Sequence, residues 1–200
     1  MYKSDREIFV YSPPRTGSTY IWQILSALFG KKIGKSHVFP IHPEKYIVIA
    51  TLRHPIDTIC SWMRVHHVPF EYQGVERFYP EFQKHWNKMD ESKTLSNFHC
   101  LRYELFQSNP NYLFHELERI FHIVIPTALR TSMAEKFSKE ENRKIAKTIP
   151  KFSLFDPTSY IHGEHVSDTQ KSWKELLPQT HHPSTLNLFH PQLTRFGYTP

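Results

Sequence analysis

The 200-residue sequence is poor in cysteine and has neither a long apolar run nor a repeated segment. Its two cysteines, Cys60 and Cys100, are too few for a disulfide framework and form no C-x-x-C metal motif. No run approaches the roughly 18 apolar residues that cross a bilayer, so we expect no membrane span. The first residues contain no apolar stretch of the secretory type. These absences favour a cytoplasmic protein with a single domain over residues 1–200.

Acidic residues are outnumbered by basic ones. The chain has 25 Lys and Arg against 19 Asp and Glu, a net charge of +6 at pH 7, and 14 histidines that add positive charge below neutrality. This charge favours an anionic ligand but does not distinguish nucleic acid, anionic membrane and a phosphorylated cofactor. The histidines show no H-E-x-x-H or comparable ligand spacing, so we expect no metal site.

Apolar patterning predicts a strand followed by a helix, twice in succession. Residues 7–12 and 46–52 are short strand-forming runs, and the second is unbroken, which is typical of a parallel strand buried on both faces. Apolar residues at helical spacing follow each run, over 21–29 with Gly30 as C-cap, and from Pro55 onward. This order predicts a three-layer α/β fold around a central parallel sheet, with ligands bound beyond the carboxyl ends of the strands.

The remaining segments show less regular patterns. We expect a helix around 78–89, a strand over 98–105, a helix over 112–123 and an irregular loop over 153–169. No Gly/Ser-rich linker separates them from the first half, which again favours one domain.

Residues 12–20, Ser-Pro-Pro-Arg-Thr-Gly-Ser-Thr-Tyr, lie between the first strand and its helix. Backbone N–H groups at such a position converge on the positive end of the helix dipole, which binds phosphate or sulfate. Gly17 permits close approach of the backbone, and Arg15 is a permanent cation. Hydroxyl donors come from Thr16, Ser18 and Thr19. The Walker A lysine is absent, which disfavours a standard nucleotide triphosphatase, and simple capping of the helix is the alternative.

This stretch resembles the 5′-phosphosulfate loop, P-[KR]-[ST]-G-[ST]-T-[WY], of the sulfotransferase family. That family transfers a sulfuryl group from 3′-phosphoadenosine 5′-phosphosulfate (PAPS) to a hydroxyl or amine and releases adenosine 3′,5′-bisphosphate (PAP). The resemblance implies a P-loop-like fold, PAPS as donor and no metal. It implies that Arg15 contacts the bridging oxygen and the sulfate, and that Tyr20 stacks on adenine.

The segment from Arg53 to Ser61 begins where the second strand ends and resembles the family's 3′-phosphate site, R-x-P-x-D-x-x-x-S. The resemblance implies that Arg53 and Ser61 bind the 3′-phosphate, and a guanidinium suits that role because it can bind phosphate bidentately. Without the resemblance, Arg53 pairing with Asp57 and Ser61 lying on a helix surface remain open.

Between these two motifs, residues 35–40, Lys-Ser-His-Val-Phe-Pro, resemble the K-[TS]-H-x-P stretch of the cytosolic branch of the family. The resemblance makes His37 the general base and Lys35 a second cation near the sulfate. A histidine with an ordinary pKa near 6.5 is largely neutral at pH 7 and ready to accept a proton. Glu44 is an alternative base, and His42 is a further one.

Two later segments resemble the adenine contacts of the family. Residues 101–105, Leu-Arg-Tyr-Glu-Leu, are similar to [RF]-Y-E-[DE]-L, which implies that Tyr103 contacts adenine, although a core tyrosine explains the pattern equally well. Residues 131–133, Thr-Ser-Met, resemble the T-S-F segment that lines the base, which makes Thr131 a further candidate.

The C-terminal third departs from the family pattern. Trp173-Lys174 matches the G-x-W-[KR] element in part, but the preceding residues lack the arginine and glycine of the basic-glycine loop that closes over the 3′-phosphate. Candidates to replace that loop, within 165–174, are His165, Lys171 and Lys174. Phe196-Gly197-Tyr198 resembles the terminal F-G-Y of the family, which implies a packing role.

The sequence thus predicts a sulfotransferase-like domain over 1–200 with a small-molecule or glycan acceptor, no nucleic-acid partner and possible homo-oligomerisation. Candidate acceptor contacts are Arg64, His66, His67, Tyr72 and Arg77, although a solvated helix face is the more common reason for such residues. The alternatives are a P-loop small-molecule kinase, a nucleic-acid-binding module, and a cofactor-binding relative without activity.

Overall fold

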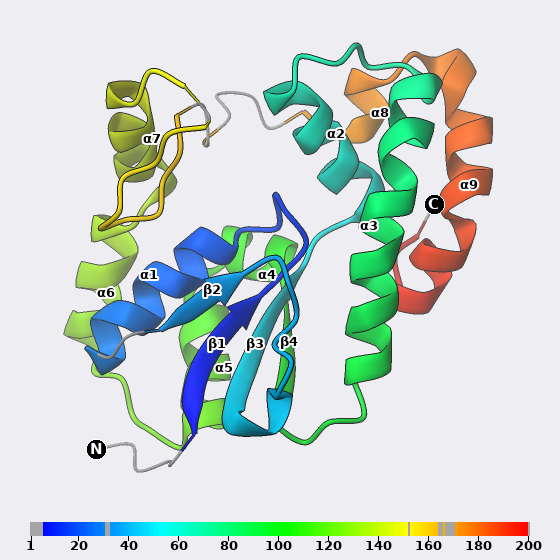
Figure 1. Ribbon diagram of the computed structural model, residues 1–200. Coiled ribbons are helices and arrows are strands. Elements are labelled where there is room, and N and C mark those ends of the chain that lie inside the picture. Colours follow the sequence, from blue (N-terminus) through cyan, green and yellow to red (C-terminus); the bar gives the residue numbers. More distant parts are fainter. Residues whose placement is uncertain (1–5, 31–32, 152, 164–165, 167–170, 200) are drawn as a thin grey trace.

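A parallel four-stranded sheet with strand order β2-β1-β3-β4 forms the centre of the computed structural model (Figure 1). The structure describes residues 6–30, 33–151, 153–163, 166 and 171–199. The strands are β1 (Glu7–Tyr11), β2 (Gly34–Ser36), β3 (Tyr46–Leu52) and β4 (Phe98–Arg102). All three strand pairings are parallel, so the predicted α/β fold with a central parallel sheet is confirmed.

The strand β3 lies inside the sheet, as its unbroken apolar run predicts, and is buried on both faces. Ile47 and Ile49 belong to one hydrophobic cluster, whereas Val48 and Ala50 belong to the other. Because successive side chains of a strand point to opposite faces, one strand supplies both cores. The sheet is therefore the middle of three layers.

Helices cover both faces of the sheet, and the helices of each face contribute to one of the two clusters. One cluster includes residues from α1 (Ser18–Phe29), α4 (Tyr103–Ser108), α5 (Pro110–Phe121) and α6 (Thr127–Lys136). The other includes residues from α2 (Pro55–Val65), α3 (Tyr72–Ser92), α8 (Trp173–Leu176) and α9 (His182–Phe196). Two short 3-10 turns, η1 and η2, span Pro43–Lys45 and Gln179–His181.

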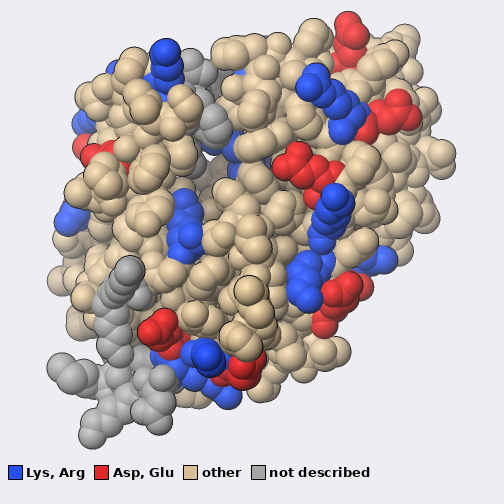
Figure 2. Space-filling model, in the orientation of Figure 1, with Lys and Arg blue, Asp and Glu red and all other residues tan. Residues whose placement is uncertain are grey.

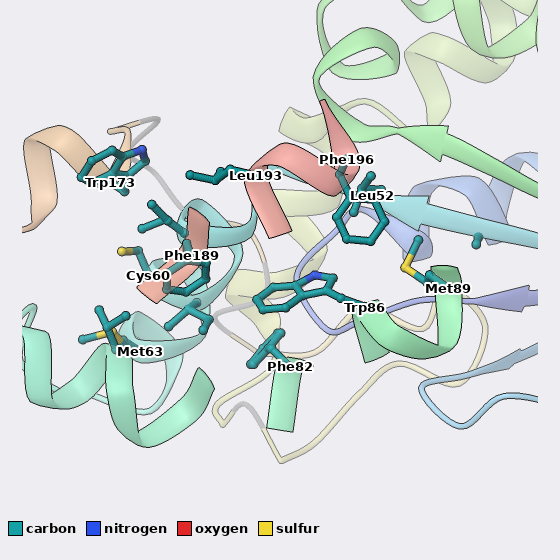
Figure 3. Packing of buried hydrophobic residues seen from close by; sticks show 14 of the residues in the cluster. Leu52, Cys60, Met63, Phe82, Trp86, Met89, Trp173, Phe189, Leu193 and Phe196 are labelled. Atoms are coloured by element: carbon teal, nitrogen blue, oxygen red, sulfur yellow. The ribbon is translucent and has the colours of Figure 1, made fainter. Parts of the chain in front are cut away.

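Large aromatic side chains fill the second cluster (Figure 3). The ring of Trp86 from α3 lies 5.8 Å from that of Phe189 from α9, and Phe82, also from α3, packs on Trp86 at 5.9 Å between centroids. Burial of one such side chain stabilises the fold by about 1.5–3 kcal/mol. This packing holds α2, and with it the end of β3, in a fixed position.

The helix α7 (Lys139–Thr148) is one of several elements, together with β2, α6 and α9, that the sequence patterns did not predict. Its buried residues are Asn142 and Ala146, too few to form a recognisable apolar stripe. A buried pair of amides attaches it to α1: Gln23 and Asn142 exchange two side-chain hydrogen bonds of 3.1 Å each.

Two elements have bounds that differ by three or more residues from the sequence prediction. The strand expected over 98–105 ends at Arg102, and Tyr103 begins α4, where the acidic Glu104 in the first turn favours the helix. The helix expected around 78–89 is longer and spans Tyr72–Ser92. The other predicted strands and helices are present, and Gly30 is the C-cap of α1 in a left-handed conformation.

The segment expected to be an irregular loop over 153–169 is irregular wherever the structure describes it, apart from an isolated bridge between Phe155 and His162. Over the described part of the chain, none of the helices has the length and apolar character needed to cross a membrane.

Candidate functional site

Three loops meet at the carboxyl edge of the sheet, because β2, β1 and β3 are parallel neighbours whose chains leave at the same edge. They border a cavity of about 430 Å³. The predicted site residues that line it are Arg15, Gly17, Ser18, Thr19, Tyr20, Lys35, His37, Arg53, Ser61 and Tyr103. Segments far apart in sequence thus contribute to one site.

Positive charge dominates this cavity. Its lining includes the basic residues Arg15, Lys35, Arg53, Arg64, Lys139 and Lys171. Asp57 is the one acidic side chain among the lining residues that the structure describes. Figure 2 shows lysine or arginine side chains at the edge of a hollow in the upper half of the displayed face. A site of this kind attracts a multiply charged anion.

The loop after β1 has a tightly turned backbone. Arg15 and Gly17 have φ angles of 68° and 86°, in the left-handed region. A Cβ at Gly17 would lie 2.8 Å from Cδ2 of Tyr103, so glycine is required there for both conformation and space. Left-handed turns at the start of a helix present backbone N–H groups to an anion.

Thr16 has a different environment from the other hydroxyl residues of this loop. Its buried Oγ1 donates to the carbonyl oxygen of Pro13 at 2.8 Å and lies 2.7 Å from Oγ1 of Thr51. Ser18 and Thr19 line the cavity, whereas Thr16 does not. The Thr16 side chain therefore fastens the loop to the end of β3.

Arg15 joins the first motif to the second. Its Nε donates to Oγ of Ser61 at 3.1 Å, and Nη1 of Arg53 donates to the Arg15 carbonyl oxygen at 3.4 Å. Burial, together with the positive charges of Arg53 and Arg64, lowers the pKa of Arg15 to about 10. The guanidinium still carries its charge at pH 7.

Arg53 does not pair with Asp57, which was the alternative left open by the sequence. Its guanidinium lies over the ring of Tyr103, 4.8 Å from the centroid. Asp57 instead accepts a hydrogen bond from the backbone N–H of Trp173 at 2.6 Å. The aspartate of this motif thus anchors α8 to α2, and Arg53 is directed to the cavity.

Lys35, on the edge strand β2, approaches the first loop from the side. Its Nζ donates to Oγ1 of Thr19 at 2.9 Å and lies 5.2 Å from the centre of the Tyr160 ring. Burial lowers the pKa of Lys35 to about 8. The ammonium group is therefore protonated at pH 7 but close to titration.

His37 follows β2 and is held by one backbone contact. Its Nδ1 lies 2.7 Å from the carbonyl oxygen of Ser12, an acceptor, so Nδ1 carries the proton and Nε2 of the neutral ring has a free lone pair. Burial lowers the pKa of His37, the Ser12 hydrogen bond opposes this, and the charges of Lys35 and His162 lower it further. The ring is neutral at pH 7 and can accept a proton at Nε2.

The two alternative bases lie elsewhere. Glu44 is exposed in η1, where its carboxylate lies 3.4 Å from Nδ1 of His42. Neither residue lines the cavity.

Aromatic side chains from α1, from α4 and from the residue after α6 line part of the cavity. The rings of Tyr20 and Phe106 stack with centroids 6.2 Å apart, and Tyr103 meets Phe106 edge-on at 5.4 Å. Phe137 also lines the cavity. The sequence interpretation missed Phe106 and Phe137, although Phe106 follows Tyr103 by three residues, which is one turn of a helix.

Thr131 is exposed on α6 and does not line the cavity. Ala134, one turn later on this helix, does. The helical phase of α6, which the sequence did not reveal, decides which of these residues points inward.

The residues that could replace the missing basic-glycine loop differ in whether they line the cavity. Lys171 lines the cavity, whereas Lys174 lies over the ring of Trp173, 5.5 Å from its centroid, and does not. His165 and residues 167–170 lie outside the described residues.

Among the predicted acceptor contacts, Arg64 lines the cavity. The other candidate acceptor contacts, which do not line it, are His66, His67, Tyr72 and Arg77.

Within the described ranges, no group of three or more His, Cys, Asp or Glu side chains lies close enough together to hold a metal ion.

Comparisons with known proteins identify the fold. No protein-family model and no curated protein sequence matches the chain. The crystal structure of mouse sulfotransferase SULT7A1 complexed with PAP matches it with a TM-score of 0.72 and 13% identity, covering 96% of this chain and 85% of the other. Retinol dehydratase in a complex with retinol and PAP matches with a TM-score of 0.70 and 11% identity, covering 96% of this chain and 82% of the other.

A second structure of retinol dehydratase, in complex with androsterone and inactive cofactor PAP, matches with a TM-score of 0.67 and 12% identity, covering 94% of this chain and 80% of the other. The chain therefore has the sulfotransferase fold, and the resemblance drawn from the sequence is confirmed at the level of fold.

Proposed function

We propose that this protein is a PAPS-dependent sulfotransferase that acts on a hydroxyl or amine acceptor, with His37 as general base. The observation that carries the proposal is that Arg15, Lys35, His37 and Arg53, from strand β2 and the loops that follow β1, β2 and β3, line one cavity. The fold shared with PAP-bound sulfotransferases supports it. We further propose that the chain forms one domain over 1–200 and acts in the cytoplasm.

The donor set of the cavity fits PAPS. The lining of the cavity supplies guanidinium, ammonium and hydroxyl groups. It also contains the aromatic rings of Tyr20, Tyr103 and Phe106. An adenosine with charged groups on both the 3′ and 5′ sides needs this combination. When bound, PAPS supplies an activated sulfuryl group for transfer.

Each residue has a distinct task in this proposal. The backbone of the β1–α1 loop, with the Ser18 and Thr19 hydroxyls, binds the phosphosulfate, and Thr16 holds this loop in place. Arg15 and Lys35 stabilise negative charge that develops on the departing oxygen. Arg53 and Ser61 bind the 3′-phosphate, and Tyr20 and Tyr103 contact the adenine. Thr131 remains a prediction of the sequence motif.

His37 accepts the proton of the acceptor hydroxyl or amine at Nε2. The Ser12 carbonyl keeps the second ring proton on Nδ1, so Nε2 is free in the neutral ring. The same carbonyl then stabilises the imidazolium that forms. Positioning and charge stabilisation do most of the work, as in phosphoryl transfer.

The acceptor is proposed to be a small molecule or a glycan. The structures of retinol dehydratase hold retinol and androsterone, which are small molecules bearing one hydroxyl group, and this supports a small acceptor here.

Transfer of labelled sulfate from PAPS to a panel of phenols, steroids, amines and glycans tests the proposal. We expect transfer to at least one acceptor class, and we expect PAP to raise the unfolding temperature of the protein. If ATP with magnesium stabilises the protein and PAP does not, the kinase alternative is correct. Binding of PAP without transfer to any acceptor identifies an inactive relative. Affinity for nucleic acid with a steep salt dependence and no need for a 3′-phosphate identifies a nucleic-acid-binding module.

A further inference from the structure

Arg64 is a third guanidinium group at the junction of the two anion motifs. It lies three residues after Ser61 on α2, a spacing that places two side chains on one face of a helix. Both residues line the cavity. Because Ser61 is also bonded to Arg15, guanidinium groups from two loops and one helix gather at one place.

The charges of these groups act on one another. Burial and the charge of Arg53 lower the pKa of Arg64, and the charges of Arg53 and Arg64 contribute to the lowered pKa of Arg15. The carboxylate of Asp57 is engaged by the Trp173 backbone N–H. Like charges held this close repel, and a multiply charged anion between them relieves the repulsion.

We propose that Arg64 binds the 3′-phosphate of the nucleotide together with Arg53 and Ser61, and so takes the place of the arginine of the basic-glycine loop, which the sequence lacks before Trp173. This inference rests on the proposed function. A phosphate monoester at pH 7 carries close to two charges on three acceptor oxygens, whereas one guanidinium that binds it bidentately and one hydroxyl supply about three hydrogen bonds. Arg64 therefore sets the preference for nucleotides that carry a 3′-phosphate.

Arg64 is better placed for this task than Lys171, the other basic candidate. It is half-buried on a helix of the scaffold, and its guanidinium lies 5.8 Å from the centre of the Phe70 ring. Lys171 is exposed and presents a single ammonium. A fork of N–H donors on a rigid element loses less freedom on binding than an exposed lysine does.

The experiment compares the affinities of PAP and of adenosine 5′-phosphate by calorimetry for the wild type, Arg64→Gln and Arg119→Gln. Arg119 is a matched control because it is exposed on α5 and pairs with Glu116. We expect Arg64→Gln to weaken PAP binding by about tenfold and to leave adenosine 5′-phosphate binding nearly unchanged, because one charged hydrogen bond to the 3′-phosphate is lost. Arg119→Gln is expected to change neither affinity.

Three outcomes overturn the inference. The first is an Arg64→Gln protein, folded by its thermal unfolding curve, that loses affinity for both nucleotides equally or for neither. The second is that Lys171→Gln, and not Arg64→Gln, removes the preference for PAP. The third is a wild type without that preference, which refutes the proposed function as well. If Arg64→Gln does not fold, the same two affinities are measured for Arg64→Lys. We expect this variant to lose part of the preference for PAP over adenosine 5′-phosphate, because lysine cannot bind phosphate bidentately.

Discussion

Nε of Arg15 donates a hydrogen bond to Oγ of Ser61 at 3.1 Å, across 46 positions of sequence. Arg15 lies in the loop after β1, and Ser61 lies in the second turn of α2, after β3. The bond therefore joins two motifs that the sequence presents separately. It is possible because β1 and β3 are adjacent parallel strands whose carboxyl ends meet at one edge.

Ser61→Ala is expected to weaken PAP binding by about tenfold, because it removes a hydroxyl donor and frees Arg15 from its position. Calorimetric titration with PAP measures this. Thr148→Ala is the control, since that hydroxyl is exposed at the end of α7 and donates to the Ile145 carbonyl. An unchanged affinity in Ser61→Ala contradicts the assignment.

Gly17→Ala is expected to destabilise the protein by about 2 kcal/mol more than Gly30→Ala does, because added atoms must displace Tyr103. Both glycines have positive φ, 86° and 56°, but a Cβ at Gly30 meets no atom within 4 Å. Gly30→Ala therefore incurs only the backbone strain of about 1–2 kcal/mol. Urea unfolding of the two variants measures the difference, and equal losses show that the loop is not as tightly packed as described.

His37→Gln is expected to slow sulfuryl transfer by about 10²–10⁴-fold while PAP still binds, since a general base contributes about that much. Under the proposed mechanism, the neutral ring of His37 is the active form in the wild type. With the pKa of His37 below 6.5, kcat/KM should stay level as the pH falls to 6.5 and decline only at lower pH. Glu44→Gln, which alters the exposed alternative base, should retain activity. A loss in Glu44→Gln without one in His37→Gln reverses the assignment.

Lys35 is expected to cause the decline of kcat/KM on the alkaline side of the pH profile. Under the proposed mechanism, the ammonium form of Lys35 is the active one. Because burial lowers its pKa to about 8, kcat/KM should fall as the pH rises through 8. Lys35→Arg keeps a charge at high pH and should move this decline to higher pH. If kcat/KM declines at the same alkaline pH in Lys35→Arg as in the wild type, the decline is caused by another group.

Tyr198→Phe is expected to lower the free energy of unfolding by about 1–2 kcal/mol, because a carboxylate loses a hydrogen-bond donor. Glu104 accepts from the Tyr198 hydroxyl at 3.0 Å and from the His54 backbone N–H at 2.7 Å. It thus ties the C-terminal segment to the start of α2. Tyr46→Phe is the control, since that ring packs on Phe9 at 5.3 Å between centroids. If Tyr198→Phe and Tyr46→Phe have equal free energies of unfolding, the hydrogen bond from Tyr198 to Glu104 does not stabilise the fold.

Local patterns predicted the part of the fold that depends on local interactions. The strand at 46–52 was recognisable because a strand buried on both faces needs apolar residues at every position, and α2 because Pro55 suits the first helical turn. The helix α7 was not recognisable, because its attachment to α1 rests on the amide pair of Gln23 and Asn142 rather than on an apolar stripe.

The amino-acid sequence alone is enough to predict a parallel sheet, two loops after β1 and β3 that match anion-binding motifs, and an excess of basic over acidic residues. Those properties follow from hydrophobic period, turn residues and charge, all of which are local. Which side chains share the cavity depends on the three-dimensional arrangement: Arg64 lines it, whereas Thr16, Glu44 and Thr131 do not. Helical phase, strand adjacency and packing bring distant residues together, and no short stretch of sequence specifies them.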